Sequence, residues 1–152
     1  MGWARDPGET RARMTLRVSP RERGGTPALP FSQNVVAILP ARAGSRRLRD
    51  KNLRRVGGAT LLQRSIRQAR AAREVGAVFV STDSSRYARH ARAAGAQVPF
   101  LRPGRLATAV ARTEDAVLHL ARRLRLPDDT LLVVVQPTSP FRTARDIDAC
   151  IR

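Results

Sequence analysis

The hydrophobic pattern changes sharply at Asn34. From there, short continuous apolar runs alternate with longer segments in which apolar residues recur at helical spacing. The runs at 35–39, 77–80 and 131–135 have the length and composition of strands buried on both faces. Strands that alternate with helices predict a mostly parallel sheet with helices on both faces, which is a Rossmann-like three-layer α/β fold.

Hydroxyl residues stand where the helical spacing begins, and such residues commonly cap helices. The expected helix starts are Thr60, Ser84 or Ser85, Thr113 and Thr143. Gly95 stands where a glycine often ends a helix. Residues 97–100 are a weaker strand or an extended segment, since Pro99 has no N–H for a strand ladder.

Residues 1–33 show no sustained apolar periodicity and are rich in Arg, Gly and Pro. We expect this segment to be a disordered basic leader ahead of one domain at 34–152. Two alternatives stay open. The segment is a basic arm with a partner, or translation begins at Met14 or later.

The formal charge is +17, and nearly all of the basic residues are arginines spread through the predicted helices. This distribution favours solvated helix faces over a nucleic-acid platform, so nucleic acid is not an expected partner. No apolar run has the length of a membrane span and the N-terminus lacks a secretory signal. Cys150 is the one cysteine. We expect it to pack in the core of a cytoplasmic protein without a membrane partner.

Three loops follow the predicted strands and should meet at one edge of the sheet, where ligands of such folds bind. They are 40–52, 81–83 and 136–142. The first is basic, and its Gly44 is expected to let the backbone turn and present N–H groups to an anion. Its candidate phosphate-binding side chains are Arg42, Ser45, Arg46, Lys51 and Asn52. The loop is neither a Walker A loop nor a dinucleotide-binding loop, and a solvated surface loop is a fair competitor.

The string from Leu39 to Arg46, followed by Lys51-Asn52, resembles the opening motif of the acylneuraminate cytidylyltransferases, also called CMP-sialic acid synthetases. Three later strings resemble their later motifs in the same order: Val80-Ser81-Thr82-Asp83, Val98 to Pro103, and Gln136 to Thr143. The resemblance implies a nucleotidyltransferase fold for 34–152. It also implies that the domain is incomplete at its C-terminus, because family members continue well beyond this point.

The resemblance implies transfer of CMP from CTP to a sugar acid such as N-acylneuraminate, with release of pyrophosphate. Triphosphate would be held by Arg42, Gly44, Ser45, Arg46 and Lys51, with Arg42 and Lys51 as the catalytic residues. By the same resemblance, Asn52 and Arg102 would contact cytidine, Thr113 the base, and Gln136 the sugar acid. Mg²⁺ would assist through ligands outside this chain, and a homodimer is expected.

The resemblance departs at Ala109-Val110, where such enzymes usually carry an Asp-Thr pair. Nucleotide specificity is therefore open. The alternatives are a sister nucleotidyltransferase that uses another nucleotide or sugar, and a non-catalytic remnant that binds nucleotide. A basic nucleic-acid-binding protein ranks last, because it rests on charge alone.

Overall fold

The computed structural model describes residues 15–16, 34–45 and 48–152. Its main sheet has four strands in the order β1-β6-β2-β5. Three are parallel: β2 (Val35–Pro40), β5 (Ala77–Ser81) and β6 (Leu131–Val134). The fourth, β1 (Thr15–Leu16), pairs antiparallel with β6. The predicted mostly parallel sheet is confirmed.

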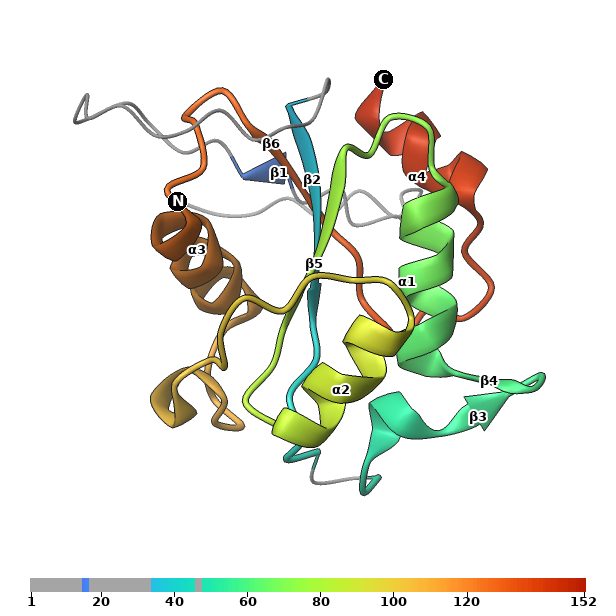
Figure 1. Cartoon of the computed structure of the whole chain (residues 1–152), viewed down its shortest axis with the longest axis vertical. Coiled ribbons are helices and arrows are strands. Elements are labelled where there is room, and N and C mark those ends of the chain that lie inside the picture. Colours follow the sequence, from blue (N-terminus) through green and yellow to red (C-terminus); the bar gives the residue numbers. More distant parts are fainter. Residues whose placement is uncertain (1–14, 17–33, 46–47) are drawn as a thin grey trace, which may run out of the picture.

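Helices cover both faces of this sheet, as Figure 1 shows. On one face lie α1 (Leu61–Ala71), α2 (Ser85–Ala93) and α4 (Ala144–Ile151), and on the other lies α3 (Thr113–Leu124). Two short 3₁₀ helices, η1 (Lys51–Leu53) and η2 (Gly104–Leu106), lie in the loops. The three-layer arrangement predicted from the sequence is therefore confirmed.

Side chains of a strand point alternately to opposite faces, so a strand between two helix layers must be apolar at every position. In β2, Ala37 and Leu39 pack against α1, α2 and α4, while Val36 and Ile38 pack against α3. All four are buried. Burying one large aliphatic side chain is worth roughly 1.5–3 kcal/mol. This two-sided burial explains the continuous apolar runs.

Three of the predicted helix caps are present. Thr60 and Gln63 form a reciprocal capping box at α1, Ser84 caps α2, and Thr143 caps α4. The prediction for Thr113 is wrong, because Arg112 is the N-cap of α3 and makes no side-chain capping bond. Thr113 is instead the first residue of α3, so its hydroxyl is not needed to cap the helix.

Other expectations differ from the structure. A small hairpin of β3 (Arg55–Val56) and β4 (Ala59–Thr60) lies between the first loop and α1, where no strand was predicted, with Gly57 and Gly58 in left-handed conformations at its turn. Cys150 is exposed, so its predicted core position is wrong. Within 1–33, β1 forms a strand pair where none was expected. The remaining residues of that segment lie outside the described part of the chain.

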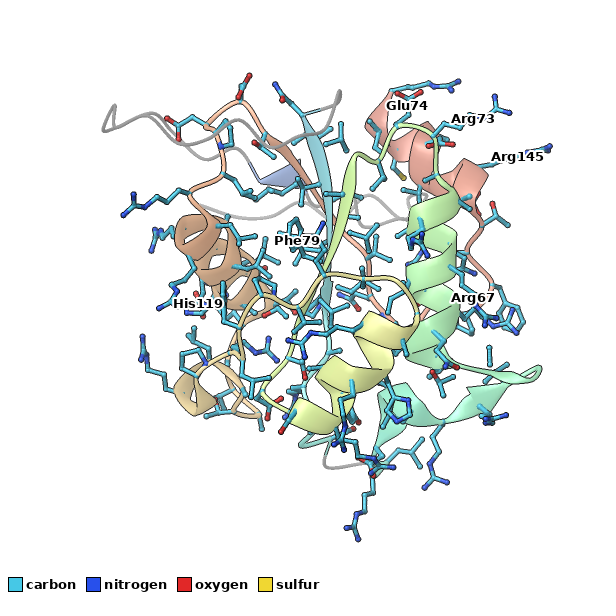
Figure 2. The ribbon with its side chains drawn as sticks, viewed as in Figure 1. Arg67, Arg73, Glu74, Phe79, His119 and Arg145 are labelled. Atoms are coloured by element: carbon cyan, nitrogen blue, oxygen red, sulfur yellow. The ribbon has the colours of Figure 1, made fainter. Side chains whose placement is uncertain are left out.

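Many arginines lie on the outer faces of the helices. In Figure 2, Arg67 and Arg73 near α1 and Arg145 on α4 point away from the sheet, and all three are exposed. In the described part of the chain, no helix is long and apolar enough to cross a membrane. Much of the positive charge thus lies on solvated surface outside the sheet edge described below.

Candidate functional site

A cleft opens at the carboxyl ends of β2 and β6. Three segments line it: the loop after β2, the stretch from Arg102 to Thr113, and the loop after β6. The cleft brings together most of the candidate residues, namely Arg42, Ser45, Lys51, Asn52, Arg102, Thr113 and Gln136. It also contains residues that the sequence did not single out, namely Pro40, Leu106, Thr108, Ala111, Arg112, Pro137 and Thr138. Arg46 lies outside the described residues.

The described residues of the loop after β2 form the first wall of the cleft (41–45 and 48–53). Backbone and side-chain bonds tie this wall to β5 and its loop: Ala41 N–H donates to Ser81 O (2.9 Å) and Ala43 N–H to a carboxylate oxygen of Asp83 (3.0 Å). The two ends of the wall are joined by Asn52, whose side-chain amide donates to Arg42 O at 3.4 Å. The predicted loop 81–83 therefore accepts hydrogen bonds from the first wall and does not itself line the cleft.

Residues 103–112 form the second wall of the cleft. Its hydrogen bonds among the described residues join positions three apart, such as Ala107 N–H to Gly104 O (2.9 Å) and Ala111 N–H to the Thr108 hydroxyl (3.1 Å). Ala109 and Val110 lie outside the cleft lining, and Val110 is 90% exposed. The second wall is thus held by local bonds.

Arg102 lies at the base of the second wall and is the most buried of the cleft's charged residues, at 6% exposure. Its backbone N–H donates to Thr82 O at 2.7 Å, which fixes the residue to the loop after β5. Burial lowers the pKa of Arg102, while the charge of Asp83 opposes this effect. Its Nε is buried without a hydrogen-bond partner among the described residues. A buried guanidinium with donor capacity left over favours an anionic ligand in the cleft.

Lys51 is the only lysine in the sequence, where every other basic side chain besides the histidines is an arginine. An ammonium is a compact point charge with three rotatable donors, whereas a guanidinium is a planar fork. In a chain that otherwise uses arginine, a single lysine that lines the cleft is a distinguishing feature of the site. Among the described residues, the other cations that line the cleft are Arg42, Arg102 and Arg112.

Gly44 belongs to the first wall of the cleft. It does not line the cleft, its φ is not in the left-handed region, and an added Cβ would meet no atom within 4 Å. Its predicted role of presenting backbone N–H groups to an anion stays a prediction. Among the described residues of this loop, Asp50 is the left-handed one, with φ 51° and ψ 36°.

The loop after β6 carries Gln136, which is exposed at the cleft. Arg142 closes this loop, because its Nη1 donates to Gln136 O at 3.3 Å. Burial lowers the pKa of Arg142, and Asp146 opposes that effect. On the other side, the side-chain amide of Gln68 on α1 donates to Pro140 O at 3.3 Å. The loop that presents Gln136 is thus supported from within and from α1.

A protein-held Mg²⁺ does not fit the described residues. The lining of the cleft includes no carboxylate among them, and no group of three or more metal-ligating side chains occurs in the described part of the chain. Asp83, the strand-end carboxylate nearest this edge, already accepts the Ala43 N–H. We therefore derive no step of the chemistry through a metal ion.

The fold and the cleft together define an α/β protein with a cation-lined cleft at the carboxyl edge of its parallel sheet. Residues 36–152 match the family model described as cytidylyltransferase, and the chain belongs to that family.

Two sequence relatives are similar to most of this chain. The chain is 39% identical over 116 residues to CMP-N,N'-diacetyllegionaminic acid synthase of Legionella pneumophila, which covers 74% of this chain and 50% of the relative. It is 35% identical over 118 residues to N-acylneuraminate cytidylyltransferase of Escherichia coli, which covers 78% of this chain and 27% of the relative. The chain therefore spans half or less of the length of these relatives.

A solved structure supports the fold. The chain matches a CMP:2-keto-3-deoxy-manno-octonic acid synthetase complexed with CTP with a TM-score of 0.65 and 23% identity. The match covers 78% of this chain and 45% of that structure. At this identity, the likeness concerns the fold alone.

Proposed function

We propose that this chain forms the CTP-binding part of a cytidylyltransferase that transfers CMP to a sugar acid. The observation that carries the proposal is the convergence of Arg42, Lys51 and buried Arg102 in one cleft at the carboxyl edge of the sheet. Cations on a fixed backbone suit a triphosphate, because catalysis of phosphoryl transfer depends mainly on positioning and charge neutralisation. Membership of the cytidylyltransferase family favours cytidine as the nucleoside.

In the proposed reaction, the anomeric hydroxyl oxygen of the sugar acid forms a bond to the α-phosphorus of CTP. The bond from that phosphorus to the bridging oxygen breaks, pyrophosphate leaves, and the hydroxyl proton passes to solvent. Arg42, Ser45 and Lys51 would hold the triphosphate, with Arg42 and Lys51 stabilising the charge that moves onto the leaving group. Asn52, Arg102 and Thr113 would contact the nucleoside, and Gln136 the acceptor.

A sugar acid is the acceptor class that the relatives' names share: a legionaminic acid derivative, N-acylneuraminate and 2-keto-3-deoxy-manno-octonic acid. All three names describe acids, so the acceptor brings a carboxylate to a cleft whose described side chains are cationic or neutral. N-acylneuraminate stays our specific proposal within this class. The homodimer, the assisting Mg²⁺ and the cytoplasmic setting stay predictions.

The test measures nucleotide binding by the intact chain. Thermal-shift and calorimetric titrations are carried out with CTP, UTP, GTP and ATP. A ligand at ~100 times its dissociation constant stabilises the folded state by about 2.7 kcal/mol. We expect CTP to reach this stabilisation at a lower concentration than UTP, GTP or ATP. An equal response to another triphosphate would favour a sister nucleotidyltransferase, and no response to any would overturn the proposal.

Lys51→Ala should weaken CTP binding by about 10- to 100-fold, because a charge-assisted hydrogen bond to phosphate is lost. The matched control is Arg89→Ala, which removes one positive charge from an exposed position on α2. If both variants lose the same factor, the effect comes from net charge and not from a contact with the triphosphate.

A further inference from the structure

Asp50 is the turning point of the first wall. It is the N-cap of η1 in a left-handed conformation, and its side chain makes no capping bond to that helix. Left-handed backbone is uncommon outside glycine, although Asp and Asn adopt it more readily than most residues. Such a conformation persists where the surroundings hold it in place. The surroundings of Asp50 are therefore informative.

Both carboxylate oxygens of Asp50 have partners on α2. Arg86 Nη1 lies 2.9 Å from Oδ2, and the Tyr87 hydroxyl donates to Oδ1 at 3.4 Å. The two partners come from different environments. The Arg86 side chain is 58% exposed, whereas Tyr87 is 1% exposed and belongs to the core between the sheet and α1. One carboxylate thus links the first wall both to the surface of α2 and to the core.

The Tyr87 hydroxyl remains a donor across the physiological range. Burial, together with the neighbouring Asp50 carboxylate, raises the pKa of Tyr87 to about 12. The hydroxyl proton is therefore available to Asp50 wherever the protein is folded near neutral pH. Because the ring is packed in the core, the hydroxyl has a fixed position, and its hydrogen bond to Asp50 holds the loop in place.

The position of Asp50 determines the residues that follow it. Leu53 N–H donates to Asp50 O at 2.8 Å, which closes the turn of η1. Lys51 and Asn52 lie within that turn and line the cleft, and Asn52 is buried and bonded to Arg42 O. A change at Asp50 would therefore shift Lys51, which is proposed to hold the triphosphate, whereas Asn52 is also held by its bond to Arg42 O.

We propose that Arg86 and Tyr87, acting through Asp50, are positioning residues that hold Lys51 in the geometry that binds the triphosphate of the nucleotide. This inference rests on the proposed function. It adds a set of three residues, the Asp50 clamp (Asp50, Arg86 and Tyr87), none of which lines the cleft. The clamp acts through Lys51 on the triphosphate end of the nucleotide, so we expect the nucleoside end, which Asn52, Arg102 and Thr113 are proposed to contact, to change little.

The test compares Arg86→Ala with Arg89→Ala, which lies on the same helix, is also exposed and removes the same charge. Affinities for CTP and CMP are measured by calorimetry. The contribution of an exposed ion pair corresponds to about a 2- to 5-fold change in an equilibrium constant. Arg86→Ala should therefore weaken the affinity for CTP by about that factor. CMP should change by less than about 2-fold in the same variant, because a triphosphate contact is what is disturbed. Arg86→Lys keeps a cation beside Asp50 and should restore most of the loss.

A second readout needs no nucleotide. Amide hydrogen exchange at residues 48–53 should be faster in Asp50→Gly, which removes both side-chain bonds while tolerating the left-handed backbone. Tyr87→Phe keeps the buried ring and should accelerate exchange to a lesser degree. If wild type binds no nucleotide, the proposed function fails and exchange still decides the clamp. Equal CTP loss in Arg86→Ala and Arg89→Ala, or unchanged exchange in Asp50→Gly, would overturn the clamp.

Discussion

The two walls of the cleft are held in different ways. The first wall is bonded across long stretches of sequence to the end of β5 and to α2, through Ala43 to Asp83 and through Asp50 to Arg86. The hydrogen bonds of the second wall, among the residues that the structure describes, connect positions three apart. Arg102 is the point where the second wall is fixed to Thr82.

This difference indicates that the two walls differ in rigidity. Long-range bonds fix a backbone at the level of the whole fold, whereas local turns open with little free energy. The side proposed to hold the triphosphate is therefore set before a ligand arrives. The second wall, which lies between Arg102 and Thr113 in the sequence, can adjust, and its Val110 is exposed.

The largest expected difference between the walls is in amide hydrogen exchange. In the unliganded chain, amides of Ala41, Ala43 and Leu53 should exchange on the order of 100-fold more slowly than those of 105–111, because the latter open locally. Saturating CTP should slow exchange at 105–111. Similar rates in both walls without ligand would remove the basis of the comparison.

Arg102→Met tests the fixed end of the second wall. Loss of a buried guanidinium should weaken CTP binding by about 100-fold, while the unliganded chain gains about 1–2 kcal/mol, because an apolar side chain of similar size replaces a buried charge. Calorimetry and urea unfolding measure the two effects. Arg105→Met, at an exposed neighbour, serves as control. Loss of both affinity and stability would show that Arg102 is a structural residue.

Tyr87→Phe tests the core end of the first wall through pH. The folded-state pKa of Tyr87 is raised to about 12 from the ordinary 10, so folding favours the neutral hydroxyl. The corresponding stability is fully present below pH 10 and is lost as the pH rises from 10 through about 12. The loss should be on the order of 2 kcal/mol in wild type and absent in Tyr87→Phe. Urea unfolding between pH 8 and pH 12 would measure it, and parallel profiles for the two proteins would contradict it.

Thr108→Ala should have the smallest effect. It removes the hydroxyl that accepts the Ala111 N–H on the exposed second wall. Surface changes of this kind are usually within about 0.5 kcal/mol, and urea unfolding should show no more. CTP affinity should stay within about 2-fold of wild type. A loss above about 1 kcal/mol would show that the second wall is more ordered than its local bonds imply.

The sequence predicted what depends on local pattern. Continuous apolar runs predicted the parallel strands, and hydroxyl residues predicted the starts of α1, α2 and α4. Thr113 misled because any hydroxyl before a helical pattern resembles a cap, while neighbouring Arg112 takes that position through its backbone. The strand β1 was missed because a two-residue pair depends on a tertiary partner.

The candidate site shows the same limit. The motifs identified seven described residues that gather in the cleft. The supporting contacts of Asp83, and of Asp50 with α2, connect residues 40 and 36 positions apart, and no local pattern carries that information. The one available signal was a polar residue, Asp50, immediately before Lys51-Asn52, where a short side chain tolerates left-handed backbone.

The short strand β1 has a consequence for handling the protein. By pairing with β6, it covers backbone groups that would otherwise form an open edge of the sheet. Open edges are templates for intermolecular pairing. An expression version that starts at Asn34 would remove Thr15 and Leu16, and we expect it to precipitate more readily than one that starts at Met14. The boundary chosen for a purified domain should therefore lie upstream of Thr15.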